Sequence, residues 1–138
     1  MNKLLRLIVV AGLITIGSAS ALLQGTPGDD FSIAHNNLMN ILLNIQQQAS
    51  ALNSPYAKAI KTNIDQAIKQ DTIANTECQL NGLQVVDAVH ILLLQYLNLA
   101  HEAAGNITNS YLSKQIEAAK QAAWNANQAC HAYINSLN

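Results

Sequence analysis

The stretch that decides the fold is LQVVDAVHILLLQYLNLAHEAA, residues 83–104, which is apolar on nearly every side when drawn as a helix. Polar residues interrupt it, among them Asp87, His90, Gln95 and Asn98. A helix that is apolar almost all round lies at the centre of a core, forms a partner surface, or crosses a membrane. The polar interruptions favour the first two, so we expect no stable membrane insertion. The remaining apolar surface predicts self-association through this helix or binding of a protein partner.

Gly, Pro and Asn residues divide the rest of the chain after residue 21 into three more segments with a helical period. Predicted helices run from about residue 30 to 52, from residue 55 to a point between 71 and 80, and from about 108 to 137. Ser54 before Pro55 is typical of a helix start, and Gly105-Asn106 is typical of a helix end. No segment alternates as a strand does. The sequence therefore predicts an all-α, up-down-up-down four-helix bundle with short connections.

Each of these three helices repeats apolar residues every three or four positions, which predicts the side that faces the core. The predicted inward positions are Ile33, Leu38, Ile41, Leu42, Ile45, Ala49 and Leu52 in the first helix, Ile60, Ile64, Ala67 and Ile68 in the second, and Leu112, Ile116, Ala119, Ala123, Cys130, Ile134 and Leu137 in the last.

The start of the chain has the order of a secretory signal peptide. Lys3 and Arg6 precede the apolar run 7–16, and small residues at 19–21 form an A-x-A cleavage site. The run is shorter than the roughly 20 residues that span a bilayer. We predict a signal peptide at 1–21, a flexible tail at 22–29 and one helical-bundle domain at 30–138, exported to the periplasm or the medium. In a host that glycosylates secreted proteins, Asn106 begins an acceptor sequon.

The charge of the exported chain argues against a nucleic-acid partner. Removal of residues 1–21 leaves five lysines, no arginine and eight acidic residues, a net charge of −3. A phosphate backbone is bound by a stripe of basic residues, and five scattered lysines do not form one.

The two cysteines, Cys78 and Cys130, are expected to pair. Export delivers both thiols to an oxidising compartment, where pairing with each other is the simplest outcome. In an up-down-up-down bundle the second and fourth helices run parallel, and each cysteine lies late in its helix. The topology therefore brings them to the same end of the bundle. Free thiols or an intermolecular bridge are the alternatives.

Residue spacing offers little support for a metal site or an enzyme. His90 and His101 are about 16 Å apart along a helix that rises about 1.5 Å per residue, too far to bind one metal ion. Asp87 and His90 have the i, i+3 spacing of di-iron bundles, but none of the three glutamates repeats it. Cys130 and His131 point about 100° apart on a helix and cannot act as a thiolate–imidazole pair. We therefore expect neither a metal site nor catalysis.

One resemblance points to a cofactor. The stretch Asn127-Gln128-Ala129-Cys130-His131 resembles the C-x-x-C-H haem motif of cytochrome c′, an exported four-helix bundle, with Asn127 in place of the first cysteine. In the related cytochrome b562 family, a methionine early in the first helix and a histidine late in the last hold the haem. Met39 and His131 are similar in placement. The resemblance implies a b-type haem-binding, electron-transfer bundle as the alternative. The leading hypothesis is a disulfide-stabilised exported bundle that binds a partner and holds no cofactor.

Overall fold

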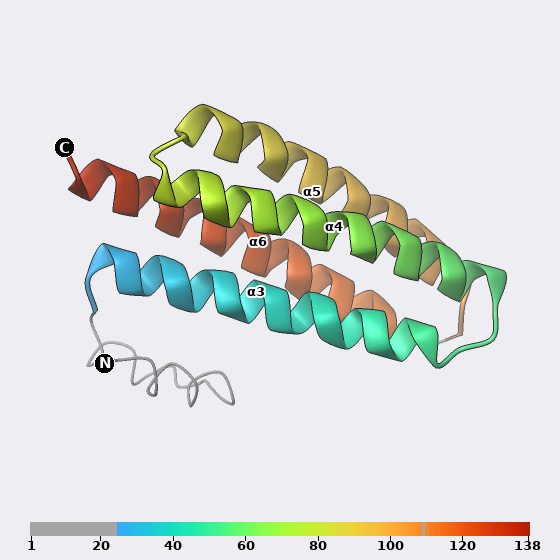
Figure 1. The fold of residues 1–138 in the computed structure, drawn as a ribbon. Coiled ribbons are helices and arrows are strands. Elements are labelled where there is room, and N and C mark those ends of the chain that lie inside the picture. The colour runs from blue at the N-terminus through green and yellow to red at the C-terminus, as the bar shows by residue number, and fades with distance from the viewer. Residues whose placement is uncertain (1–24, 109) are drawn as a thin grey trace.

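The computed structural model describes residues 25–108 and 110–138, which form four antiparallel α-helices (Figure 1). They are α3 (Pro27–Ser50), α4 (Pro55–Gln79), α5 (Leu83–Ala104) and α6 (Ser110–Ser136). Each helix packs against its two neighbours in the order α3, α4, α5, α6, and α6 closes the ring against α3. The described part of the chain contains no strand, so the predicted all-α four-helix bundle is confirmed. The predicted signal peptide lies outside the described residues.

The first two helices each begin with a hydroxyl cap followed by a proline. The Oγ1 of Thr26 accepts a hydrogen bond from the backbone N–H of Asp29 at 3.2 Å, and Pro27 occupies the first turn. The helix was predicted to begin near residue 30, three residues too late, because the cap at Thr26 and the proline after it were not recognised. Ser54 caps α4 as predicted, since its Oγ accepts hydrogen bonds from the backbone N–H groups of Tyr56 and Ala57 at 3.1 and 3.3 Å.

The turn between α4 and α5 uses an asparagine where a glycine is usual. Asn81 has a φ of 63°, and no described glycine has a positive φ. Its N–H bonds the carbonyl of Cys78 at 3.1 Å, while the N–H of Gly82 bonds that of Glu77 at 2.7 Å. These two bonds make a Schellman motif, which satisfies the last carbonyls of α4. The motif places the end of α4 at Gln79, inside the range that the sequence left open.

Most of the core is one aliphatic cluster along the bundle axis, and a smaller cluster surrounds the cysteines. The smaller cluster consists of Phe31, Cys78, Val86, Cys130 and Ile134. It lies where α3 and α5 begin and where α4 and α6 end, which we call the disulfide end (Figure 1). The predicted inward positions are buried or half-buried except for Leu52 and Leu137, which are 36% and 54% exposed. Both lie past the last residue of their helix, where the period no longer applies.

Candidate functional site

The disulfide between Cys78 and Cys130 is formed, with a Cα–Cα distance of 6.0 Å. It joins α4 to α6, a diagonal pair that makes little direct contact. Both cysteines are 0–1% exposed, and no described cysteine is free. The predicted pairing is therefore confirmed. Disulfides of this kind persist in proteins of oxidising compartments, which agrees with export.

His131, beside the disulfide, contacts α5. Its Nε2 lies 2.8 Å from Oδ1 of Asp87, and Asn127 Nδ2 donates to the same oxygen at 3.1 Å. An ionised carboxylate only accepts hydrogen bonds, so the histidine ring is the donor. Cys130 and His131 thus point to different neighbours, as their spacing predicted. We call Asp87, Asn127 and His131 the α5–α6 clasp.

Charge and burial act in opposite directions in this region. Burial raises the pKa of Asp87, but hydrogen bonds from His131 and Asn127, together with the charges of His131 and His90, hold that pKa below 3.8. Burial is also the main reason that the pKa of His90 lies below 6.5; the charge of His131 lowers it further and that of Asp87 opposes both. His90 is therefore a neutral ring at pH 7, with one donor and one acceptor nitrogen.

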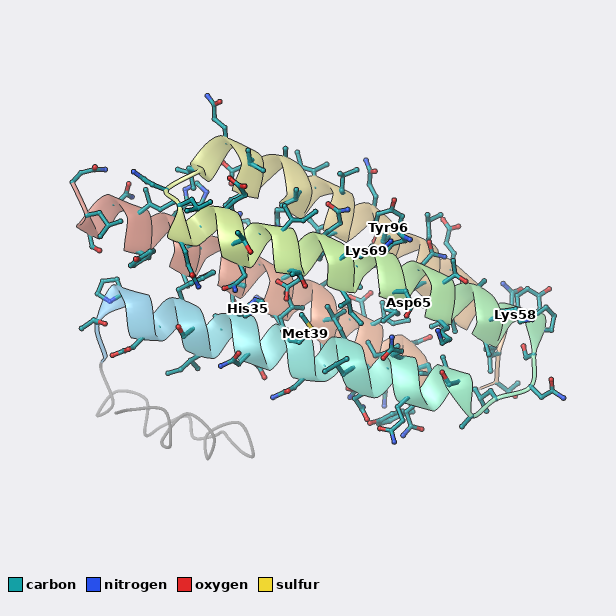
Figure 2. The ribbon with its side chains drawn as sticks, viewed as in Figure 1. His35, Met39, Lys58, Asp65, Lys69 and Tyr96 are labelled. Carbon is teal, nitrogen blue, oxygen red and sulfur yellow. A yellow bond between two sulfur atoms is a disulfide. The ribbon has the colours of Figure 1, made fainter. Side chains whose placement is uncertain are left out.

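Met39 and His131 do not face each other in this structure. Phe31 near the start of α3 stacks on Tyr133 near the end of α6, with ring centroids 6.4 Å apart. That contact sets Tyr133 near the level of Phe31. His131 lies two residues earlier in the antiparallel helix, so Met39, labelled in Figure 2, is offset from it by about six residues, or about 9 Å at about 1.5 Å per residue. The Nε2 of His131 is also directed to Asp87, and Cys130 has no free thiol. Met39 and His131 therefore do not fit a Met–His haem site in this arrangement. The haem alternative remains a prediction.

A buried carboxylate was not predicted from the sequence. Asp71 of α4 is 3% exposed and faces His35 of α3. The Nδ1 of His35 hydrogen-bonds Oδ1 at 3.3 Å, whereas Oδ2 lies 3.1 Å from the same nitrogen without a hydrogen bond. The signal was present, because Asp71 continues the spacing of the buried residues Ile64 and Ala67. The sequence left this part of α4 unassigned to either face.

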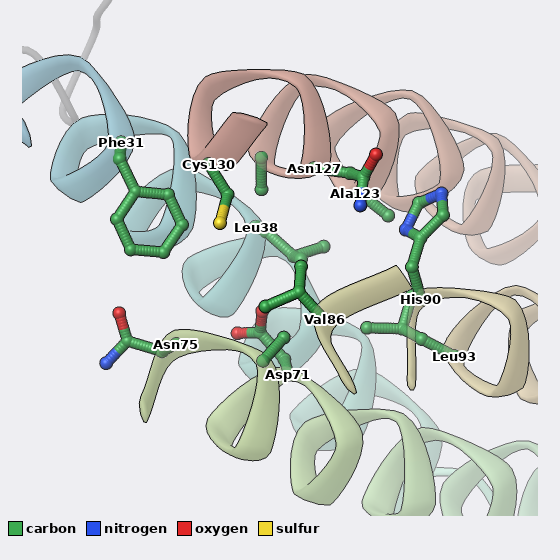
Figure 3. Close-up of a pocket in the computed structure, with 12 residues that line it drawn as sticks. Phe31, Leu38, Asp71, Asn75, Val86, His90, Leu93, Ala123, Asn127 and Cys130 are labelled. Carbon is green, nitrogen blue, oxygen red and sulfur yellow. The ribbon is translucent and has the colours of Figure 1, made fainter. Parts of the chain in front are cut away.

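Asp71 borders a cavity of about 20 Å³ at the disulfide end (Figure 3). All four helices contribute to its wall, which is mostly apolar. The polar side chains in the wall belong to Asp71, Asn75, His90 and Asn127. Among the described residues, no group of three or more His, Cys, Asp or Glu side chains could hold a metal ion.

The other candidate site is the outer face of α5. Among the described helices, α5 is the one that is long and apolar enough to cross a membrane. Core helices of soluble proteins can be equally long and apolar. Its most apolar window has a mean hydropathy of 1.4, and only 28% of that window is buried inside the bundle. The exposed positions include a row that we call the outer stripe: Val85, Ala88, Leu92, Gln95, Leu99 and Glu102.

Comparison of the chain with protein-family models, with curated proteins and with solved structures finds no match in any of the three.

Proposed function

We propose that this is an exported protein that acts by binding rather than by catalysis, and that the outer stripe of α5 docks a second copy of the chain. The observation that carries the proposal is the exposure of large apolar side chains there. Val85, Leu92 and Leu99 are 43%, 41% and 48% exposed, and they repeat at intervals of seven residues. Exposed apolar rows of this kind mark interaction surfaces.

The spacing of the outer stripe favours a helix as the occupant. Its members alternate by three and four residues, the pattern by which one helix packs along another in a coiled coil. About 18 residues of α5 take part, which is about 27 Å of helix at about 1.5 Å per residue. An α5 helix from a second copy offers a partner of matching length.

Charge favours an antiparallel second copy. Glu102 is the charged residue of the outer stripe, near the C-terminal end of α5, and the N-terminus of α5 at Gly82 has no side-chain cap. An antiparallel copy places each Glu102 near the uncapped N-terminus of the other helix, where the helix dipole favours a negative charge. A parallel copy would set the two glutamates side by side. In the antiparallel register, small Ala88 of one copy faces large Leu99 of the other.

Sedimentation velocity over a concentration series tests the proposal. We expect the processed wild-type chain to dimerise and Leu92→Glu to weaken the dimer at least 100-fold. Leu43→Glu is the matched control, since Leu43 is 45% exposed on α3, away from the outer stripe. A monomeric wild type, or equal effects of the two variants, would refute the proposal. Binding of that monomer to lipid vesicles would assign the face to a membrane instead.

Disulfide trapping tests the register. Ala88→Cys mixed with Leu99→Cys is expected to form a crosslinked dimer on mild oxidation, whereas Ala88→Cys alone should form little. Preferential crosslinking of Ala88→Cys with itself would indicate a parallel arrangement. The native disulfide does not interfere, because both of its cysteines are buried.

A further inference from the structure

The wall of the cavity at the disulfide end contains polar atoms that make no hydrogen bond to the protein. The Oδ2 of Asp71 is buried without a hydrogen bond. Within the described part of the chain, the side chains of Asn75 and His90 also make no hydrogen bond or ion pair. A buried polar group left unsatisfied destabilises the fold, because it has lost its hydrogen bonds to water without gaining others. The Oδ2 of Asp71 is the buried unsatisfied atom of the wall, whereas Asn75 and His90 are half-buried. A small hydrogen-bond donor in the cavity would satisfy that oxygen.

The size of the cavity limits what can bind. A volume of about 20 Å³ accommodates one water-sized molecule, since about 10–15 Å³ measured in this way is sufficient for one. Phe31, Leu38 and Val86 are among the apolar residues of the wall, and the carboxylate of Asp71 points into the space among them (Figure 3). A bulkier ligand does not fit without separating these side chains.

The chemistry of the wall determines the kind of molecule. The carboxylate of Asp71 only accepts hydrogen bonds when it is ionised, so the bound molecule must be a donor. Neutral His90 and the amide of Asn75 each offer a further acceptor. Alkali and alkaline-earth ions prefer six or more oxygen ligands, which this wall does not provide. The wall suits a small donor such as water or an ammonium ion.

We propose that this cavity is a binding site for one water-sized hydrogen-bond donor, anchored by Asp71, and that the donor it takes is a water molecule or an ammonium ion. The two share the same hydrogen-bond chemistry, and ammonium adds a positive charge beside the buried carboxylate. This inference is independent of the outer stripe, because it rests on groups in the interior. It also gives Asp71 a role that its pairing with His35 leaves open.

Thermal unfolding in ammonium chloride and in sodium chloride at equal ionic strength separates the two donors. If ammonium binds, the wild type melts at a higher temperature in ammonium chloride, and the difference grows with concentration. Asp71→Asn should abolish that difference. Asp65→Asn should retain it, since Asp65 is a more exposed carboxylate on the same helix. Tetramethylammonium chloride should have no such effect, because the ion is too large, and this control needs no variant to fold.

Nuclear magnetic resonance with ¹⁵N-ammonium provides a direct readout. A bound ion shielded from exchange gives its own ¹H–¹⁵N signal, expected in the wild type and absent in Asp71→Asn. If ammonium has no effect, a high-resolution crystal structure should show an ordered water bonded to Asp71 Oδ2, which supports the water form of the proposal. A dry cavity, or an ammonium effect that Asp71→Asn retains, would overturn it.

Discussion

Removal of the Cys78–Cys130 disulfide should lower the free energy of unfolding by about 4 kcal/mol. The two residues are 52 apart in sequence, and the chain-entropy relation gives about 4 kcal/mol for closing a loop of that length in the unfolded state. For a domain of this size, 1 kcal/mol shifts the melting temperature by roughly 3–6 °C, so we expect a decrease on the order of 15 °C in Cys78→Ala/Cys130→Ala.

Urea unfolding followed by circular dichroism measures this loss, with the reduced wild type as control. The m value should rise in the variant, because its unfolded chain lacks the crosslink and is more expanded. Each single variant already breaks the bond, so Cys78→Ala, Cys130→Ala and the double variant should lose similar amounts. A loss below about 1 kcal/mol, or single losses that add up in the double variant, would refute the reasoning.

Four further predictions concern the clasp, the turn and the processed chain. His131→Ala should cost about 0.2–1 kcal/mol, because the clasp is partly exposed. Since the folded pKa of Asp87 lies below 3.8, its stabilising effect should be complete near neutral pH and disappear as the pH falls below about 4; Asp87→Asn should flatten that part of a stability–pH curve, and an unchanged curve would contradict the assignment. At Asn81, a change to Gly should leave stability unchanged or slightly higher, while Val should cost about 1–2 kcal/mol in urea unfolding; equal stability of the two would show that the left-handed turn does not form. Native mass spectrometry of the exported protein should show a chain that starts at Leu22, lacks two hydrogens and carries no haem; a haem adduct lost in His131→Ala would instead establish the cytochrome alternative.

The sequence predicted the bundle because local signals agreed with one another. Ser54, Asn81-Gly82 and Gly105-Asn106 lie between helices in the structure, and Pro55 is the first residue of α4 as predicted. The disulfide followed from topology, because parallel second and fourth helices bring Cys78 and Cys130 together. The predicted start of α3 was three residues late, because the cap at Thr26 was not recognised in the sequence.

The interior polar groups could not be predicted in the same way. Asp71 has the spacing of a core residue but the chemistry of a surface residue, and its partner His35 is 36 positions away on another helix. The Asp87–His131 contact spans 44 positions. Such pairs depend on how each helix rotates about its axis. Helical period alone fixes that rotation only approximately.

The disulfide and the buried carboxylate act on stability in opposite directions. Asp71 with an unsatisfied oxygen destabilises the fold by about 1–3 kcal/mol, and it lies two helical turns from Cys78 on the same helix. The crosslink, worth about 4 kcal/mol, is sufficient to offset that loss at the same end of the bundle. A core built only for stability would place an apolar residue at position 71, as α4 does at Ile64 and Ala67. Retention of a carboxylate there is what a binding site requires, and the disulfide allows the bundle to accommodate it.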